Sequence, residues 1–319
     1  MSGFAIAVAH PNIALSKYWG KRPGPNVPAV PSLSVTLAGL STTTTVTFDP
    51  RFTSDTFELD GEEQGGPTRS RVIELLDRVR ASSRRSTFAR VVSRNDFPTA
   101  SGLASSASGF AALALAAVRA SGQGARLSDV ADLARRSSAS AARSVFGGFV
   151  ELDGEVARAV ATKDALDLRV LVCVTTEAKK AVGSSEGMGV TARESPFYPA
   201  WLEEAPRLHR ELRAALLAGD FDRVGELAER SALAMHASAM AAGVVYVSGA
   251  TLAALDEVRA LRRDGISAWA TIDAGPHLKC LVRSGDVAAV RARLEQSPGV
   301  LRVLVAEPGD GARIVEVRS

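Results

Sequence analysis

The chain has 319 residues, of which 46% are hydrophobic and 23% are charged. This length suits one large or two medium domains, and the composition excludes a disordered, collagen-like or disulfide-stapled protein. The longest apolar run, Phe110 to Val118, is less than half of a bilayer span, and the amino terminus lacks the basic flank and cleavage site of a signal peptide. We therefore expect a soluble cytoplasmic protein with no membrane partner.

The 38 basic and 35 acidic residues give a net charge of +3 and are mixed along the chain. This balance favours small anionic ligands and argues against nucleic acid, which would require a basic stripe with interleaved aromatic residues. Cys173 and Cys280 lie in separate apolar runs, so we expect two buried thiols. The four histidines show no metal-ligand spacing, which argues against a zinc site.

The first half mixes strand and helix patterns. Strands are predicted over residues 4–9, 32–37, 42–48, 88–93 and 147–152, with an edge segment over 57–66. Helices are predicted over residues 68–81, 105–121 and from an N-cap at Ser128 to about Ala139. We therefore expect an α+β domain over residues 1–165.

The second half gives a strand over residues 168–175, then three helices, two strands, a helix and two closing strands. The helices are predicted over 198–218, 221–241, 248–264 and 286–296, and the later strands over 267–272, 278–282, 301–306 and 313–317. This order resembles a ferredoxin-like split βαβ unit with an enlarged first crossover, which we assign to a domain over residues 166–319. No low-complexity linker separates the halves, so we expect the ligand to lie between them.

A loop rich in small residues runs from Pro98 to Gly109 and leads into an alanine-rich helix. Backbone N–H groups near Gly102, serine hydroxyls and the positive end of the helix favour a phosphate site. No lysine follows the glycine, so this is not a Gly-x4-Gly-Lys-Ser/Thr loop. The alternative is a helix start whose small residues serve only close packing.

Only six of the 38 basic residues are lysines, and two of them, Lys17 and Lys21, flank Tyr18 and Trp19. In a chain so rich in arginine, a lysine marks a position where a small, rotatable ammonium is wanted. The cluster therefore suits an anionic substrate. A surface loop anchored by its aromatic residues is an equal alternative.

Arg143 and Ser140 follow a predicted helix and precede Gly147. Arg143 is suited to hold a carboxylate with two hydrogen bonds, whereas Arg135 and Arg136 are expected on a solvated helix face. Taken alone, this segment favours a purely structural role.

Asp273 directly follows a predicted buried strand and precedes a Gly-Pro turn. Such a position suits an acid–base or orienting carboxylate. An aspartate that merely opens a β-turn explains the pattern equally well.

In this order and at these separations, the segments resemble the diphosphomevalonate decarboxylase family of the GHMP kinase superfamily. The matching stretches are residues 12–14, 17–21, 32–37, 97–109, 140–148, 182–188 and 273–276. The resemblance implies a GHMP kinase-like α+β fold, with a ribosomal protein S5 domain 2-like, ATP-binding N-terminal half and a ferredoxin-like C-terminal half. It also implies a homodimer.

The resemblance implies an ATP- and Mg2+-dependent reaction in which (R)-5-diphosphomevalonate yields isopentenyl diphosphate, CO2, ADP and phosphate. The 3-hydroxyl is phosphorylated first, and loss of that phosphate then draws electrons from the departing carboxylate. Asp273 would orient or deprotonate the hydroxyl, Lys17 would keep Asp273 ionised, and Arg143 with Ser140 would hold the C1 carboxylate.

The same resemblance implies binding roles for further residues. The 5-diphosphate and the rest of the substrate would contact Tyr18, Lys21, Ser184, Ser185 and Ala274. The ATP site would comprise Ser93, Asn95, Pro98, Ser101, Gly102, Leu103, Ala104, Ser105 and Ser106, with Ser105 and Ser106 as candidate Mg2+ ligands.

Two positions depart from the family pattern. Ser185 stands where bacterial relatives often carry arginine, and His277 stands where asparagine is usual. The first departure leaves room for a 5-monophosphate substrate. The sequence is also compatible with a mevalonate kinase that stops after 3-phosphorylation and with a non-catalytic GHMP-like binding protein.

Overall fold

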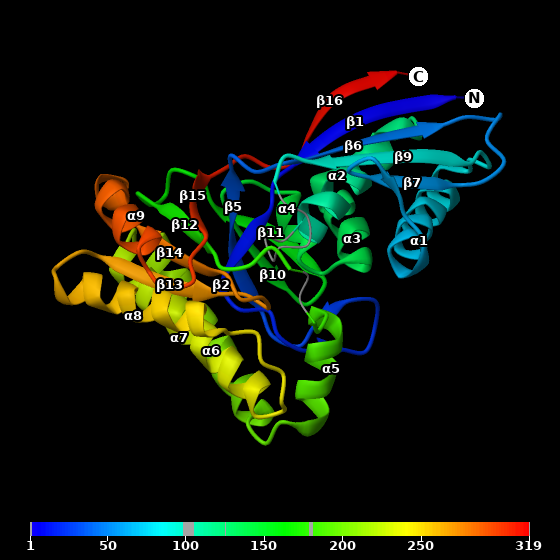
Figure 1. Cartoon of the computed structure of the whole chain (residues 1–319). Coiled ribbons are helices and arrows are strands. Elements are labelled where there is room, and N and C mark those ends of the chain that lie inside the picture. The colour runs from blue at the N-terminus through cyan, green and yellow to red at the C-terminus, as the bar shows by residue number, and fades with distance from the viewer. Residues whose placement is uncertain (1, 98–104, 125, 179–180, 319) are drawn as a thin grey trace.

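The computed structural model describes residues 2–97, 105–124, 126–178 and 181–318. Its first sheet has the strand order β16-β1-β6-β9-β7-β8, and only the β7–β9 pair is parallel. The strands are β1 (Gly3–Ala9), β6 (Thr42–Phe48), β7 (Thr56–Leu59), β8 (Glu62–Glu63), β9 (Ala89–Asn95) and β16 (Arg313–Arg318). Because β16 pairs with β1, the two ends of the chain lie side by side (Figure 1).

Four helices belong to this part: α1 (Gly66–Ser83), α2 (Ser105–Ala120), α3 (Leu127–Ser137) and the short α4 (Ala141–Ser144). The central helix α2 packs on β1 and β6 and also contacts α3 and α4. Its alanines are buried on every side, which lets these neighbours approach closely. At the start of α2, Ser106 lines the cavity described below.

The second sheet has the order β11-β10-β5-β15-β12-β14-β13, with β2 paired to β5. Its strands are β2 (Asn12–Ser16), β5 (Ser32–Ala38), β10 (Phe149–Asp153), β11 (Val156–Ala161), β12 (Arg169–Val174), β13 (Ala268–Ile272), β14 (Leu278–Val282) and β15 (Arg302–Pro308). The order β15-β12-β14-β13 is that of a split βαβ unit, which confirms the ferredoxin-like prediction. Hydrogen bonding between β15 and β5 makes the sheet continuous across the two halves.

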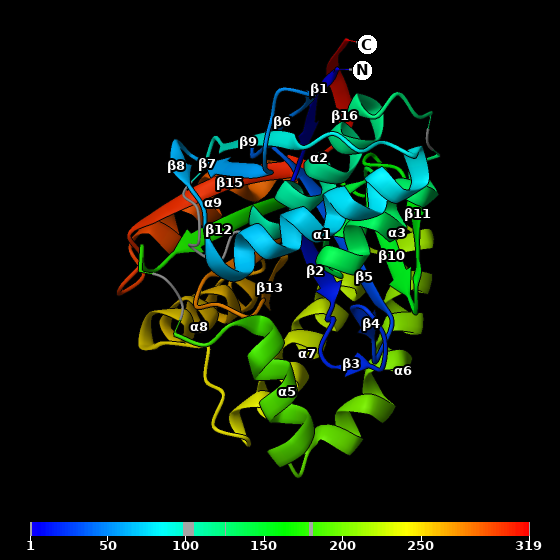
Figure 2. The ribbon, with the colours of Figure 1, turned by 90° about the vertical axis from the view of Figure 1, so that its right-hand side faces the viewer.

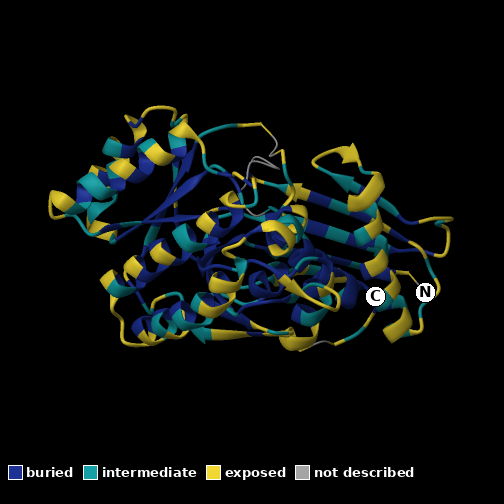
Figure 3. Cartoon of the chain, turned by 90° about the horizontal axis from the view of Figure 1, so that it is seen from below, coloured by how far each residue is buried: buried dark blue, intermediate teal, exposed yellow. Residues whose placement is uncertain are grey.

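Helices cover both faces of the C-terminal strands. They are α6 (Tyr198–Leu217), α7 (Phe221–Met240), α8 (Gly249–Arg263) and α9 (Val287–Glu295), with a 3-10 turn at Ser284–Asp286. A further helix, α5 (Ser184–Glu194), contacts α7. Val172 and Leu281 pack with α6 and α7, whereas Leu171 and Cys280 pack with α8 and α9 on the opposite face. Figure 3 shows the result, with a buried interior and exposed outer helix faces. None of the helices in the described ranges is long and apolar enough to cross a membrane.

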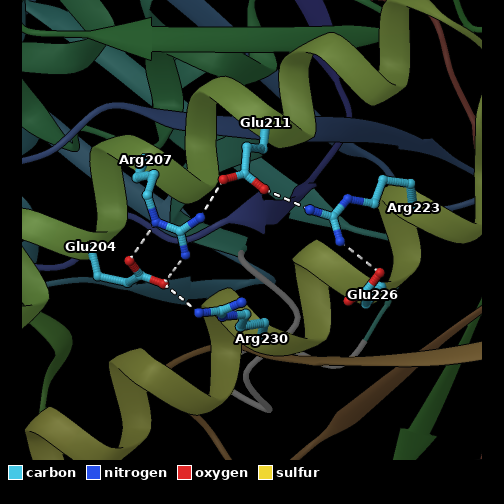
Figure 4. A network of polar contacts seen from close by, with 6 residues as sticks. All are labelled: Glu204, Arg207, Glu211, Arg223, Glu226 and Arg230. Carbon is cyan, nitrogen blue, oxygen red and sulfur yellow. Dashed lines mark hydrogen bonds and ion pairs between the residues drawn. The ribbon is translucent and has the colours of Figure 1, made fainter.

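Ion pairs join the outer faces of α6 and α7 (Figure 4). Glu211 of α6 accepts from Arg207 of the same helix and from Arg223 of α7, whose guanidinium lies 2.6 Å from the Glu211 carboxylate. Glu204, Glu226 and Arg230 extend the network. The network therefore links α6 to α7, whose inner face reaches the candidate site described below.

The strands and long helices lie within a few residues of their predicted ranges, and both cysteines are buried free thiols as predicted. One local prediction is wrong, and several elements were not predicted. Ser128 is not the N-cap of α3, because that helix begins at Leu127. The N-cap residue is Arg126, whose backbone is extended. The strands β2 and β11 and the helix α5 were not predicted. The domain boundary at residue 165 remains a prediction.

Candidate functional site

A cavity of about 680 Å³ opens between the two halves. Residues after β2, before and within α4, at the start of α5 and after β13 all line it. Arg71 of α1 also contributes, and Figure 2 shows α1 above α5 on this side of the molecule. Its lining includes the predicted residues Lys17, Tyr18, Lys21, Ser106, Ser140, Arg143, Ser184, Ser185, Asp273 and Ala274.

Lys17 and Asp273 both line the cavity and form an ion pair. Lys17 follows β2 and is 2% exposed, and its Nζ lies 2.6 Å from Asp273 Oδ1. The same ammonium donates to the carbonyl of Ala14 at 2.8 Å, and the Lys17 backbone N–H donates to Ser231 Oγ of α7 at 3.0 Å. These bonds leave Lys17 little freedom to turn away from Asp273.

Two ammonium groups determine the ionisation of Asp273. Burial opposes its negative charge, but Lys17 and Lys279, whose Nζ lies 3.2 Å from Asp273 Oδ2, outweigh that cost and hold the pKa of Asp273 well below its usual range. Burial lowers the pKa of Lys17 to about 8, and the Asp273 charge opposes a larger fall. Asp273 is therefore an anion at neutral pH, and Lys17 is mainly a cation.

Arg143 projects from α4 into the same cavity and is 2% exposed. Its Nε lies 3.2 Å from Asn12 Oδ1 and 3.1 Å from Ser34 Oγ, and its Nη1 donates to Ser32 Oγ at 2.8 Å. Burial lowers the pKa of Arg143 to about 10, so the side chain stays charged at neutral pH. A fixed, buried guanidinium of this kind suits an anionic ligand.

The loop after β2 turns sharply at Gly20, whose φ is +101°. A Cβ there would lie 2.1 Å from the hydroxyl oxygen of Tyr198, so both the turn and the packing require glycine. Trp19 is buried behind the loop and meets Tyr246 edge to face, with ring centroids 5.8 Å apart. The loop therefore presents Tyr18 and Lys21 to the cavity from a rigid base.

Tyr18 and Lys21 both line the cavity. The Tyr18 hydroxyl is buried and forms no hydrogen bond within the described residues. Lys21 Nζ donates to Asn26 Oδ1 at 2.8 Å and to Ser185 Oγ at 2.9 Å, which links the loop to the start of α5. Ser184 and Ala274 line the same cavity.

The predicted nucleotide residues are more dispersed. Ser105 opens α2 and Ser106 faces the cavity, whereas Ser93 and Asn95 lie on β9 outside its lining. Ser93 Oγ lies 2.8 Å from Thr44 Oγ1, and Asn95 accepts from Thr42. Pro98, Ser101, Gly102, Leu103 and Ala104 lie outside the described residues.

Sequence reasoning missed several supports of the site. Arg135 is fully buried and hydrogen-bonds Pro25 O, Asp132 and Glu155, so the prediction of a solvated face is wrong for Arg135, whereas Arg136 is exposed as predicted. Two acidic partners and a carbonyl compensate its burial. Lys279 was also given no role, although a lone lysine within an apolar strand was a usable signal.

His277, the second departure from the family pattern, is fully buried. Its Nδ1 lies 3.2 Å from the backbone nitrogen of Thr175, so the ring accepts a hydrogen bond from that N–H. The contact joins the residue just after β12 to the turn that carries Asp273. His277 therefore supports the backbone behind the site.

Comparisons with known proteins show the family to which the chain belongs. The model of the diphosphomevalonate decarboxylase-like N-terminal domain matches residues 9–162, and that of the mevalonate 5-diphosphate decarboxylase C-terminal domain matches residues 170–301. The diphosphomevalonate decarboxylase of Candida albicans is 33% identical over 86% of this chain and 82% of its own length. The phosphomevalonate decarboxylase of Haloferax volcanii is 35% identical over 82% of each chain.

Solved structures extend the likeness over the whole fold. Mevalonate diphosphate decarboxylase from Staphylococcus aureus superposes with a TM-score of 0.93, at 34% identity over 99% of both chains. A structure described as MDDEF in complex with MVAPP, AMPPCP and magnesium gives a TM-score of 0.92, at 37% identity over 99% of this chain and 100% of the other. The chain therefore belongs to the diphosphomevalonate decarboxylase family, whose members are ATP-dependent decarboxylases.

Proposed function

We propose that the protein converts (R)-5-diphosphomevalonate, ATP-dependently, into isopentenyl diphosphate, CO2, ADP and phosphate. The observation that carries this proposal is the meeting of Lys17, Asp273 and Arg143 in one cavity between the halves. Family membership supports the same reaction.

The first step is phosphoryl transfer. The 3-hydroxyl oxygen forms a bond to the γ-phosphorus, the bond from that phosphorus to ADP breaks, and the hydroxyl proton leaves toward Asp273. Lys17 offsets the negative charge that develops on the transferring group. Because Lys17 and Lys279 lower the pKa of Asp273, its carboxylate is a weak base and first orients the hydroxyl. Negative phosphates bound in the cavity beside Lys17 would raise that pKa and strengthen the base.

The second step is decarboxylation. The C3–O bond breaks and its electrons leave with phosphate, while the C1–C2 electrons form the new double bond and CO2 departs. Arg143, supported by Asn12 and Ser32, is placed to hold the C1 carboxylate in line with the developing alkene. Ser140, one turn before Arg143, contributes its hydroxyl.

Tyr18, Lys21, Ser184 and Ser185 are proposed to hold the 5-diphosphate. The buried Tyr18 hydroxyl gains a partner on binding, and Lys21 exchanges its contacts with Asn26 and Ser185 for phosphate oxygens. Ala274 packs beside the carbon chain.

ATP is proposed to bind at the start of α2, where Ser105 and Ser106 meet the positive end of the helix. No group of three acidic, histidine or cysteine side chains that would hold a metal occurs in the described ranges. This fits Mg2+ that arrives on nucleotide phosphates, with one or two serine hydroxyls as protein ligands. Mg2+ would neutralise phosphate charge during transfer.

One experiment tests the reaction. Mevalonate, its 5-phosphate and its 5-diphosphate are each incubated with ATP and Mg2+, and ADP and CO2 are scored separately. We expect equal ADP and CO2 only with the 5-diphosphate. ADP without CO2 would identify a 3-kinase, and no ATP consumption with any of the three would identify a binding protein.

Decarboxylation of the 5-monophosphate is the second candidate. Ser185 provides a hydroxyl where an arginine would provide a charge, and the Haloferax volcanii relative is a phosphomevalonate decarboxylase. Equal turnover of both substrates, or preference for the monophosphate, in the same assay would favour it.

We further propose that the protein is a cytoplasmic homodimer. Family membership supports this assembly, and light scattering coupled to gel filtration tests it. A mass near 33.4 kDa, that of a single chain, would contradict it.

A further inference from the structure

Lys279 is an unusual residue for its place in the fold. It lies at the second position of β14, between the buried residues Leu278 and Cys280, and is 1% exposed. Its ammonium forms no hydrogen bond of good geometry within the described residues. An ammonium in such surroundings requires a strong compensating charge.

That charge is Asp273. Lys279 Nζ lies 3.2 Å from Asp273 Oδ2, whereas Lys17 Nζ lies 2.6 Å from Oδ1. Each carboxylate oxygen therefore faces its own ammonium, from β14 on one side and from the end of β2 on the other.

The sheet register explains how the two lysines meet. Lys279 pairs with Thr271 of β13, and the Thr271 hydroxyl donates to the carbonyl of Ala14 at 3.3 Å. The same carbonyl accepts from Lys17. Both ammonium groups are thus held beside Asp273 by backbone that belongs to different halves of the chain.

Lys279 does not line the cavity, so it acts on a ligand only through Asp273. We propose that Lys279 is a positioning residue that clamps Asp273 Oδ2, so that Oδ1 and Lys17 face the reacting hydroxyl. This inference rests on the proposed function for its kinetic consequences, but the clamp itself is a property of the folded chain.

Other charged or titratable groups surround this pair. Lys17 follows β2, Arg143 projects from α4, His236 from α7 and Cys173 from β12. The positive charge of Lys279 lowers the pKa of Lys17, although burial is the larger cause. Loss of Lys279 should therefore raise the pKa of Lys17.

A thermodynamic cycle tests the clamp without any assay of activity. Urea unfolding is measured at pH 7.5 for the wild type, Asp273→Asn, Lys279→Met and the double variant. In the wild type, Asp273→Asn leaves two buried ammonium groups without an anion, but in the Lys279→Met background it leaves one. We therefore expect the fold decrease in the folding constant caused by Asp273→Asn to be at least ten times smaller in the Lys279→Met background than in the wild type. If the change in the folding constant of the double variant equals the product of the two single changes to within about twofold, the two residues are not coupled and the proposal is overturned.

Kinetics test the positioning role. For Lys279→Met we expect kcat to fall 10- to 100-fold, with the KM of both substrates within threefold of wild type. We also expect the alkaline limb of kcat/KM to move up by at least half a pH unit, which a merely loosened structure would not cause. Lys279→Arg, which keeps the charge, should keep the limb in place.

The matched control is Lys163→Met, because Lys163 forms a partly exposed pair with Asp310 at 2.9 Å. It should leave kcat and the pH profile unchanged. If Lys279→Met keeps the wild-type kcat and the alkaline limb of its kcat/KM profile stays at the wild-type pH, the positioning role is overturned. Should the wild type prove inactive, the unfolding cycle still decides whether the clamp exists, so failure of the proposed function and failure of the clamp are separable.

Discussion

Lys17 Nζ and Asp273 Oδ1 lie 2.6 Å apart, although 256 residues separate them in the chain. One follows β2 and the other follows β13, so the pair forms only when the two halves are packed together. The chemistry of the site is thereby coupled to the interface between the halves.

Asp273→Asn should abolish turnover while substrate affinity changes little. The amide keeps the shape of the side chain but neither accepts the hydroxyl proton nor offsets the two lysines. We expect kcat to fall by much more than tenfold. A tenfold loss corresponds to about 1.4 kcal/mol of barrier. Steady-state kinetics and substrate binding measure the two effects, with Asp256→Asn on the exposed face of α8 as control. Retention of more than about a tenth of kcat would contradict the role of Asp273.

Arg143→Lys should lose much of the rate even though the charge is kept. The Arg143 guanidinium bonds Asn12, Ser32 and Ser34 from two of its nitrogens, and a single ammonium cannot reproduce that geometry. We expect kcat/KM to fall roughly 10- to 100-fold, about 1.4 to 2.7 kcal/mol. Near-normal kinetics in a folded variant would remove Arg143 from the site.

Alkaline pH should inactivate the enzyme through Lys17. Burial lowers the pKa of Lys17 to about 8, so the ammonium is lost above that pH and with it the charge beside Asp273. We expect kcat/KM to be flat near pH 7 and to fall about tenfold per pH unit well above pH 8. A profile at constant ionic strength, with recovery after return to pH 7, provides the measurement. A flat profile to pH 9.5 would show that Lys17 does not titrate in the free enzyme.

Much of this fold could be predicted from the sequence because the elements carry strong local patterns. The alternating Thr42–Phe48 strand and the long helices α6 to α8 each have a periodicity that tertiary packing preserves. α5 escaped prediction because its glycines disfavour helix, and one of them, Gly187, is needed where α5 packs against Tyr246.

The residues of the candidate site could be proposed from the sequence, but the contacts between them could not. The family resemblance placed Lys17, Arg143 and Asp273 in one site, yet nothing local shows that Asn12, Ser32 and Ser34 would support Arg143. Those contacts span more than 100 residues and depend on β2 pairing with β5. Arg135 shows the same limit, since its burial depends on the distant carbonyl of Pro25.

The ion-pair network between α6 and α7 should contribute little to stability. Glu211→Gln removes the negative charge shared by Arg207 and Arg223, but these side chains are partly exposed and screened by water. We expect the free energy of unfolding to fall by about 1 kcal/mol or less, an effect that largely disappears near 1 M salt. Urea unfolding at low and high NaCl checks this. Glu203→Gln is the control, because Glu203 forms no ion pair with a described residue. A salt-independent loss above about 2 kcal/mol would contradict the screening argument.

His236 should make the protein less stable as the pH falls below neutrality. Its ring is 3% exposed, and Nε2 lies 3.3 Å from the carbonyl oxygen of Ile272, next to Asp273. Burial, reinforced by the charge of Lys17, lowers the pKa of His236 from 6.5 to about 4. Above pH 6.5 the ring is neutral in the folded and unfolded states, so the full stability is present.

Between pH 6.5 and 4 the His236 ring binds a proton in the unfolded chain but stays largely neutral in the folded chain. The free energy of unfolding then declines by up to about 1.4 kcal/mol per pH unit, or about 3 kcal/mol across this window. His236→Gln retains a donor toward Ile272 but does not titrate, so its unfolding free energy should decline less steeply over the same range. Because His209 also titrates with a lowered pKa, the difference between variant and wild type is the quantity to compare. Equal slopes in urea unfolding from pH 7 to 4.5 would show that His236 is protonated as readily in the folded protein as in the unfolded chain.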